Sequence, residues 1–482
     1  MRLHLESLVE RVRGALAVKE KTVASVHSSN QKVGHRADIL RTMYSSPIEV
    51  VYKTIGGFEK QEVKDVFVDD PFMQNYFLNV WEYMTGQDIL ESYPWNVTLP
   101  LADLCNARCT FCDAWLRGEG VMQVEDLERF SEVLKFARVI GIQGHGEPLA
   151  NPHIDDILSR VGELVDRRAR AYIITNGVYL ERKLDLLLRA RVEVFNVSLN
   201  ATSCETHNAV MGLGEQAYLA ILSTIRKLVE IRDRERPSIE VTISLVLTRD
   251  NIHEASNFIS LGNELGVNRI YLRTLMPLSE PKAASSWDAA GWDTAVITPP
   301  GLNYHLLPPY LHPDFAQLTE RLREDIANSI VAVETQPDTW ATPVLSKSVT
   351  DYLHSKSEPP KFIKRQVALT DKSIRQSYKS SQKQVVGHGE FVEDVLDLGP
   401  NPYGRTPHFQ CRYVYHNLCC NEMSYRMVPC CYMADVPGYR PVVLDGSGKF
   451  MDSWNSPAFV KLRQRLKHGP LFVACKTCPN QG

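Results

Sequence analysis

The sequence lacks any long hydrophobic run and any excess of charge of one sign. No apolar stretch approaches about 18 residues, so the chain is not predicted to cross a membrane. Lysine and arginine number 54 against 57 aspartates and glutamates, which leaves a formal net charge of −3 over 482 residues. This balance argues against a nucleic-acid binder, which usually carries a basic excess. The hydrophobic content of 44% is ordinary for a protein with a sizeable core.

No leader peptide is expected either, because charged residues interrupt the first 20 positions, which contain no apolar core. We therefore expect a cytoplasmic protein. In a reducing compartment, the 11 cysteines are more typical of metal ligands or catalytic thiols than of disulfides. None lies in residues 1–95, and most lie after residue 406.

The hydrophobic pattern divides the chain into four regions. Residues 1–95 are expected to be a mostly helical accessory region, and residues 407–482 a small C-terminal module. In residues 96–278, β-rich runs alternate with amphipathic helices, which predicts an α/β fold with a parallel sheet. Six such units predict a partial (β/α)6 TIM-like barrel with its site at the carboxyl ends of the strands. The expected strands are 97–101, 139–143, 171–175, 192–199, 239–247 and 269–275.

Residues 279–406 break this alternation and are expected to form an insertion or lid. They include a basic stretch, residues 356–383. Such a stretch is usually a solvated loop, and the alternative is a lid that attracts an anionic substrate.

Three cysteines follow the first expected strand in the run Cys-Asn-Ala-Arg-Cys-Thr-Phe-Cys. Cys105, Cys109 and Cys112 can bind three irons of a [4Fe–4S] cluster and leave the fourth iron open. Structural zinc, the main alternative, usually takes four protein ligands. The CxxxCxxC spacing, with an aromatic residue before the last cysteine, resembles the signature of the radical SAM superfamily.

The next strand ends in a run, Gly144-His145-Gly146-Glu147-Pro148, that is similar to that family's Gly-Gly-Glu-Pro motif. The resemblance implies that Gly146, Glu147 and Pro148 bind the amino group of S-adenosylmethionine (SAM). His145 replaces the first glycine and is either a substrate contact or a tolerated turn residue. At the other strand ends, the resemblance implies further contacts to SAM from Asn176, Ser198, Asn200, Thr248 and Arg273. Arg273 is equally a candidate for a structural ion pair.

This resemblance implies a definite chemistry. An external one-electron reductant of the flavodoxin or ferredoxin type would reduce the cluster, and SAM would be cleaved to methionine and a 5′-deoxyadenosyl radical. That radical abstracts hydrogen from an unactivated C–H bond, while the protein positions the bond and excludes water.

Four C-terminal cysteines, Cys411, Cys430, Cys475 and Cys478, surround a predicted hairpin and helix. Their spacing resembles the twitch module, a shortened SPASM domain, and is similar to that of 2-deoxy-scyllo-inosamine dehydrogenase-like enzymes. The resemblance implies an auxiliary [4Fe–4S] cluster that accepts an electron from the substrate, and a zinc ribbon is the alternative. Tyr425 stands near the place of the usual glycine of the hairpin turn.

The other four cysteines are Cys204, Cys419, Cys420 and Cys431. Burial as small apolar residues is the ordinary fate of a free cysteine, although one of these four could donate a hydrogen atom to a substrate radical in an epimerase. Cys419 and Cys420 are also possible substitutes for Cys411 as a cluster ligand.

The sequence leaves three functions open. The favoured one is oxidation or epimerisation of a polar small molecule such as a sugar, aminocyclitol or nucleoside, in natural-product biosynthesis. The second is modification of a ribosomally made peptide. Such enzymes frequently carry an N-terminal winged-helix leader-binding domain, but residues 1–95 show no clear helix–strand–strand pattern that matches one. The third, a non-catalytic iron–sulfur or zinc protein, is disfavoured by the Gly-Glu-Pro run at a strand end.

Overall fold

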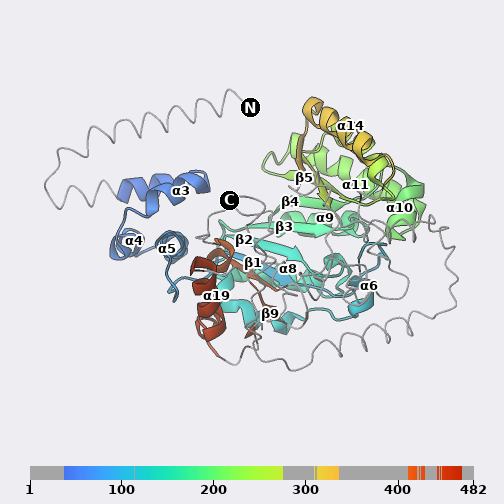
Figure 1. Ribbon diagram of the computed structural model, residues 1–482. Coiled ribbons are helices and arrows are strands. Elements are labelled where there is room, and N and C mark those ends of the chain that lie inside the picture. Colours follow the sequence, from blue (N-terminus) through green and yellow to red (C-terminus); the bar gives the residue numbers. More distant parts are fainter. Residues whose placement is uncertain are drawn as a thin grey trace, which may run out of the picture. The chain divides into compact units, whose positions relative to one another are not determined.

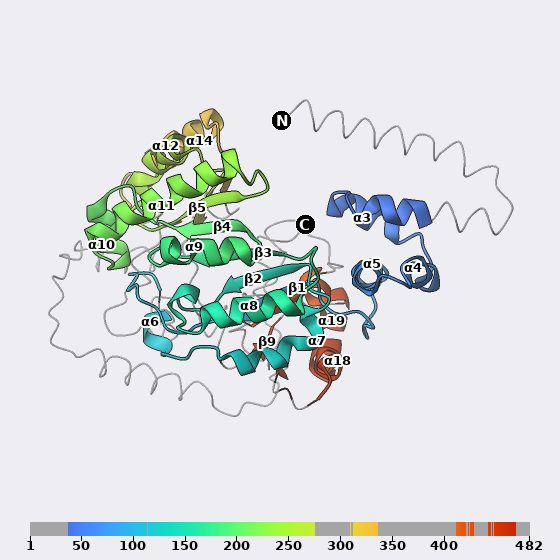
Figure 2. The ribbon, with the colours of Figure 1, turned by 180° about the vertical axis from the view of Figure 1, so that it is seen from behind.

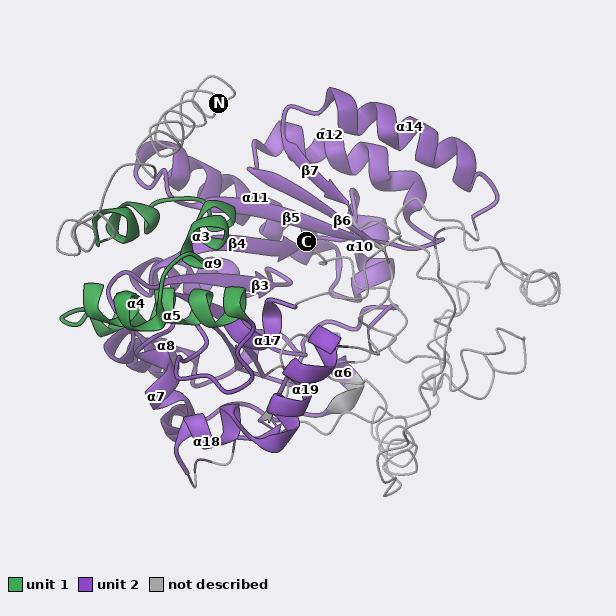
Figure 3. Ribbon diagram, turned by 60° about the vertical axis from the view of Figure 1, so that its left-hand side comes forward, with its two compact units in different colours: residues 1–85 green, residues 86–482 purple. Residues whose placement is uncertain are grey.

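The structure of the protein is a computed structural model (Figure 1). It describes residues 37–112, 114–274, 309, 312–335, 411–420, 423, 425–428, 442–444, 446 and 448–468. The chain forms two compact units, residues 1–85 and residues 86–482, which Figure 3 colours separately. The prediction of four regions with boundaries near residues 95, 278 and 406 stays a prediction.

The described part of the first unit is helical. Its helix α4 (Lys60–Val66) begins at a capping box in which Glu59 and Glu62 exchange hydrogen bonds with the backbone. Phe67 stacks on Phe77 with 5.2 Å between ring centroids, and Trp81 donates to the Phe58 carbonyl at 2.7 Å. These contacts hold the unit together around α3 (Ile48–Ile55), α4 and α5 (Pro71–Thr85).

The second unit is built on one parallel sheet of eight strands. The strand order is β7-β6-β5-β4-β3-β2-β1-β8, and each pair in it is parallel. The six predicted strands are confirmed to within a residue: β1 (Asn96–Pro100), β2 (Val139–Gln143), β3 (Arg170–Thr175), β4 (Val192–Ser198), β5 (Glu240–Leu247) and β6 (Arg269–Thr274). The sequence did not indicate the edge strands, β7 (Ala332–Thr335) and β8 (Asn417–Cys419).

Helices cover the apolar face of the sheet, as the periodicity predicts. A Cβ atom on Gly262 would meet Ile270 and Ile243, which shows that α12 (Ala255–Leu265) packs directly on β5 and β6. Figure 2 shows the helices on this side of the sheet. They are α8 (Ile154–Leu164), α9 (Leu180–Arg189), α11 (Glu215–Arg234) and α12, followed by α14 (Phe315–Asn328).

The opposite face of the sheet is polar in its centre. Asn196 of β4 lies in register with Thr242 of β5, and Ser198 lies in register with Ser244. All four side chains point away from Val197 and Ile243, because successive residues of a strand face opposite sides. Thr98 of β1 is also on this face, with its hydroxyl 3.4 Å from that of Tyr172.

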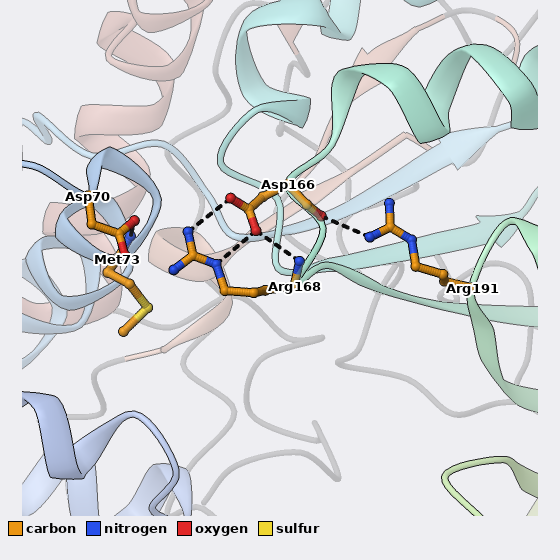
Figure 4. A network of polar contacts seen from close by, with 5 residues as sticks. All are labelled: Asp70, Met73, Asp166, Arg168 and Arg191. Carbon is orange, nitrogen blue, oxygen red and sulfur yellow. Dashed lines mark hydrogen bonds and ion pairs between the residues drawn. The ribbon is translucent and has the colours of Figure 1, made fainter. Parts of the chain in front are cut away.

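An ion pair closes the loop before β3, at the amino ends of the strands. Arg168 donates to both carboxylate oxygens of Asp166 at 2.8 and 2.9 Å, and the pKa of Asp166 is lowered by this guanidinium (Figure 4). Arg191, which precedes β4, donates to the Asp166 carbonyl at 3.5 Å. These contacts stabilise the end of the sheet opposite to the predicted site.

The C-terminal residues join the sheet beside its first strand. Cys419 of β8 lies in register with Thr98 of β1 and also forms an antiparallel bridge with Val428. Beyond it, β9 (Arg426–Met427) pairs with β10 (Val442–Val443) in an antiparallel pair, and the helices α17 (Tyr413–His416), α18 (Phe450–Trp454) and α19 (Pro457–His468) complete the described part. Tyr425 adopts a φ of 51°, a conformation that glycine takes easily.

No helix in the described part of the chain is both long enough and apolar enough to span a bilayer.

Candidate functional site

The three clustered cysteines lie on the loop that follows β1, at the carboxyl end of the sheet. Cys105 and Cys109 each lie near Cys112, and the negative charge of one thiolate raises the pKa of the neighbouring thiols. Burial is the larger cause, and it raises the pKa of Cys105 to about 12 and that of Cys109 well above its usual value. A cation bound beside these thiols would favour their ionised form.

The loop after β2 is hydrogen bonded to the cysteine loop. The amide of Gly146 donates to Ala102 O and that of Glu147 to Leu104 O, both at 2.9 Å. A Cβ atom on Gly144 would lie 2.5 Å from Ala102 O, and one on Gly146 would overlap Leu104 O. Close packing of these two loops therefore requires glycine at both positions.

Glu147 is the buried acid of the site, with a side chain 2% exposed. Its carboxylate accepts hydrogen bonds from the Thr175 hydroxyl and the Asn176 amide, both at 2.7 Å, and from the Leu149 amide at 3.1 Å. Burial raises the pKa of Glu147 to about 7, although these donors oppose the shift. An ammonium group bound beside it would restore the ionised form.

Asn176, at the end of β3, also reaches the cysteine loop. Its side-chain amide donates to Asn106 Oδ1 at 2.8 Å, while its own backbone amide binds Glu147. The predicted residues Gly146, Glu147 and Asn176 are thus brought together around Cys105. The hydrogen bond from the Thr175 hydroxyl to Glu147 was not predicted, because the sequence shows only that Thr175 is a polar residue at a strand end.

The structure places the other predicted SAM contacts along the neighbouring strand ends. Asn200 is buried and accepts from the Val246 amide at 2.9 Å. Thr248 is buried, and its amide donates to Asn251 Oδ1 at 2.7 Å, while Ser198 is half-buried. Arg273 is exposed and lies over the ring of Tyr271, with 5.2 Å from its guanidinium carbon to the centroid.

The C-terminal end of α10 (Cys204–Met211) packs against the cysteine loop. The amide of Arg108 donates to Met211 O and that of Thr110 to Val210 O, both at 2.9 Å. The Cys109 thiol donates to Met211 Sδ at 3.3 Å. This contact was not predicted either, because it joins positions 102 residues apart.

Of the remaining cysteines, Cys419 is buried beside Thr98, and Cys420 is fully buried, which raises the pKa of its thiol. Cys204 begins α10 and is half-buried, and Cys411 is half-buried just before α17. The other predicted ligands and the last hydrogen-donor candidate lie outside the described residues: Cys430, Cys475, Cys478 and Cys431.

Three cysteines on one loop are the kind of ligand set that an iron–sulfur cluster takes from a protein. Within the described residues, no three His, Cys, Asp or Glu side chains are grouped to hold a single metal ion. A [4Fe–4S] cluster binds each thiolate to a different iron, so the three thiols need only border a shared space. The backbone amides of Ala107 and Glu147 donate to Cys105, and such donors stabilise a thiolate.

The parallel sheet and the cysteine loop at its carboxyl end define an α/β protein suited to carry an iron–sulfur cluster. Residues 99–261 match the model of the radical SAM superfamily. This match covers the region that holds the cysteine loop and the Gly146-Glu147-Pro148 run, so it supports the resemblance seen in these motifs.

Curated relatives match part of the same region. A probable GTP 3′,8-cyclase from Saccharolobus islandicus (strain M.14.25 / Kamchatka #1) is 29% identical over 194 residues, which are 39% of this chain and 59% of the relative. Molybdenum cofactor biosynthesis protein 1 from Dictyostelium discoideum is 29% identical over 116 residues, 22% of this chain and 18% of that protein. The chain thus spans less than two thirds of the length of these relatives.

Among solved structures, SuiB of Streptococcus suis bound to S-adenosylmethionine aligns with a TM-score of 0.48 and 14% identity, over 89% of this chain and 84% of SuiB. BtrN in complex with AdoMet and 2-DOIA aligns with a TM-score of 0.21 and 26% identity, over 24% of this chain and 49% of BtrN.

Proposed function

We propose that this radical SAM enzyme abstracts hydrogen from a polar small molecule such as a sugar, aminocyclitol or nucleoside, and oxidises or epimerises it. When bound, SAM and its cluster supply the 5′-deoxyadenosyl radical, and an auxiliary cluster supplies an acceptor for the electron left on the substrate. A flavodoxin- or ferredoxin-type protein is the expected electron donor. No nucleic-acid or membrane partner is part of the proposal.

The residues take the following roles in this proposal. Cys105, Cys109 and Cys112 hold the first cluster, and Glu147 accepts a hydrogen bond from the SAM ammonium group, which also favours its ionised form. Thr175 holds the Glu147 carboxylate in place. Further SAM contacts come from Gly146, Pro148, Asn176, Ser198, Asn200, Thr248 and Arg273, and the auxiliary cluster is held by Cys411, Cys430, Cys475 and Cys478.

The choice of substrate class rests on the polar face of the sheet. Asn196 Oδ1 and Thr242 Oγ1 are buried, and neither has a hydrogen-bond partner among the described residues. The two residues are 7% and 1% exposed and lie in register on neighbouring strands. A buried polar atom left unpaired costs about 1–3 kcal/mol, so a ligand rich in hydroxyl or amino groups suits this face.

The first experiment measures the iron content of the anaerobically reconstituted protein and its reductive cleavage of SAM. We expect about eight irons in the wild type and about four in the Cys105/Cys109/Cys112 triple alanine variant. The variant should form no 5′-deoxyadenosine with dithionite as reductant, and circular dichroism should show that it is folded. Persistent cleavage in a folded variant would refute the assignment of the first cluster.

The substrate class is tested separately with the double variant Asn196→Leu/Thr242→Val. We expect it to keep its iron and its uncoupled SAM cleavage, because neither side chain belongs to the cysteine loop. With a panel of aminocyclitols, sugars and nucleosides, the wild type should form 5′-deoxyadenosine faster with one class, and the variant should lose most of that stimulation. Stimulation by peptides alone would contradict the proposal.

A further inference from the structure

The cysteine loop has two branches that meet at its base, beside the sheet. The outgoing branch continues from β1 at Leu101, and the returning branch ends at Met122. The Met122 amide donates to Leu101 O at 3.1 Å, and the next residues of the two branches form an antiparallel bridge. All three cysteines of the loop lie between these branches, so their position depends on how the base of the loop is held.

The side chain of Asn151 contacts both branches at this base. Its amide group donates one hydrogen bond to Leu101 O at 2.8 Å and a second to Met122 O at 2.9 Å. The residue is 1% exposed. Both hydrogens of this planar amide group are therefore used, and they fix the two carbonyl oxygens relative to each other.

Asn151 is itself held at the start of α8. Its Oδ1 atom accepts from the His153 amide at 2.8 Å, and its carbonyl group accepts from the Ile154 amide at 3.2 Å. Ile154 and Ile157 of this helix are both fully buried. Every polar atom of the Asn151 side chain thus has a partner, and the helix gives it a fixed support.

The segment that ends at Asn151 also contains Glu147, the buried acid of the site. The backbone amides of Gly146 and Glu147 donate to carbonyl groups of the outgoing branch. The hydrogen bond from Asn151 to Met122 O extends this contact to the returning branch. Residues 146–151 are therefore bonded to both branches of the cysteine loop.

We propose that Asn151 is a positioning residue that sets the distance between the cysteine loop and Glu147. This inference rests on the proposed function, in which the loop holds the first cluster and Glu147 binds the ammonium group of SAM. A ligand that contacts the cluster and Glu147 at once binds tightly only when the two are held at the right spacing beforehand. The cysteines remain without Asn151, so its loss should weaken SAM binding more than cluster binding.

Three substitutions test this role. Asn151→Ala removes both hydrogen bonds to the loop. Asn151→Asp keeps the shape of the side chain and places a carboxylate oxygen against the two carbonyl oxygens, which repel it unless it is protonated. The matched control is Asn455→Ala, because the Asn455 side-chain amide also donates to a backbone group distant in sequence, Leu90 O, at 2.7 Å.

The measurements are the iron content and the affinity for SAM, which is read from the change that SAM causes in the electron paramagnetic resonance spectrum of the reduced cluster. Both are made on protein that also has Cys475→Ala and Cys478→Ala, so that only the first cluster contributes. We expect Asn151→Ala to keep about four irons and to bind SAM about tenfold more weakly than the parent. Asn455→Ala should match the parent.

The Asp variant adds a pH profile that a merely structural role would not produce. Its affinity for SAM, relative to that of Asn151→Ala, should rise as the pH falls from about 8.5 to about 6, because a protonated carboxyl group donates a hydrogen bond again. Parallel pH profiles for the two variants would overturn the role of the donated hydrogen bonds.

Equal SAM affinities in the parent and Asn151→Ala would overturn the proposal. Loss of iron from a folded Asn151→Ala variant would also overturn it, because the loop itself, rather than its spacing from Glu147, would then depend on Asn151. If one of the two Asn151 variants does not fold, the other decides alone. The parent tests the proposed function separately: without iron or SAM cleavage there, the cluster assignment fails, whereas with both present only the role of Asn151 is in question.

Discussion

Gly146 is the residue at which the two loops of the candidate site come closest. Its amide donates to Ala102 O, and a Cβ atom would overlap Leu104 O, a backbone atom that cannot rotate away. We expect Gly146→Ala to displace the cysteine loop and to lower the rate of SAM cleavage by at least tenfold. The rate of 5′-deoxyadenosine formation under anaerobic reduction measures this effect.

Gly162 provides the matched control for this substitution. It lies within α8, and an added Cβ atom would meet no other atom within 4 Å. Gly162→Ala should keep full SAM cleavage and raise the free energy of unfolding by about 0.5–1 kcal/mol, because alanine loses less conformational entropy than glycine in a helix. Equal cleavage rates in the two glycine variants would show that the loops tolerate the extra carbon.

Because His207, on α10, is buried, we expect the free energy of unfolding to depend on pH. Burial lowers its pKa from 6.5 to about 4, and its ring lies 5.2 Å from that of Tyr218. The folded state therefore keeps His207 neutral at pH values at which the unfolded chain binds a proton. The stabilisation is complete above pH 6.5 and falls between pH 6.5 and 4, by at most about 1.4 kcal/mol per pH unit.

The measurement is urea unfolding at pH 7.5, 6 and 5. His207→Phe keeps the aromatic packing and removes the titrating group, so its stability should fall less over this range than that of the wild type. Parallel pH profiles for the two proteins would contradict this account of His207.

At the level of single residues, the local motifs could be predicted from the sequence. The side chains that contact these motifs from other strands and helices could not. A single run of eight residues contains Cys105, Cys109 and Cys112, and a single strand end precedes Gly146 and Glu147. The Thr175 hydroxyl and the Met211 thioether reach these groups only after the sheet has formed. No local pattern marks a threonine or a methionine for such a contact.

Among the elements, the central strands could be predicted and the edge strands could not. The central runs are rich in β-branched and apolar residues and alternate with amphipathic helices, so their periodicity is clear. The edge strands β7 and β8 have four and three residues, and each exists because it pairs with a strand distant in sequence. Such short segments are determined by tertiary pairing rather than by composition.

The helix α19 contains a buried cation, Arg463. Arg463 is 0% exposed and donates to Val414 O at 3.2 Å, Trp454 O at 2.9 Å and Asp88 O at 2.9 Å. The sequence predicted a helix among the C-terminal cysteines, but it gave no sign that Arg463 would be one of the buried residues of this helix. The arginine therefore joins the C-terminal helices to the segment that precedes β1.

We expect Arg463→Leu to lower the free energy of unfolding by about 3–5 kcal/mol, because three buried carbonyl groups lose their donor. Urea unfolding followed by circular dichroism measures this change. Lys461→Leu, at an exposed position of the same helix, should change the stability by less than about 0.5 kcal/mol. A small effect of Arg463→Leu would mean that water replaces the guanidinium.

At the scale of the whole molecule, the strand order places distant segments next to each other. β1 leads to the cysteine loop, and its two neighbours are β2, which leads to Glu147, and β8, which comes from the C-terminal cysteine-rich region. Cys419 and Thr98 are thus in register although they lie far apart in the sequence. This pairing supports the proposal that the C-terminal region contributes to the same reaction as the cysteine loop.

The last prediction separates the two proposed clusters. Replacing Cys475 and Cys478 with alanine removes two proposed ligands of the auxiliary cluster and leaves Cys105, Cys109 and Cys112 in place. We expect the iron content to fall from about eight to about four per chain while SAM is still cleaved. Once a substrate is known from the panel, the variant should form 5′-deoxyadenosine with little oxidised product, because the substrate radical loses its electron acceptor. Full product formation at four irons would contradict the electron-acceptor role and favour a redox-neutral reaction such as epimerisation.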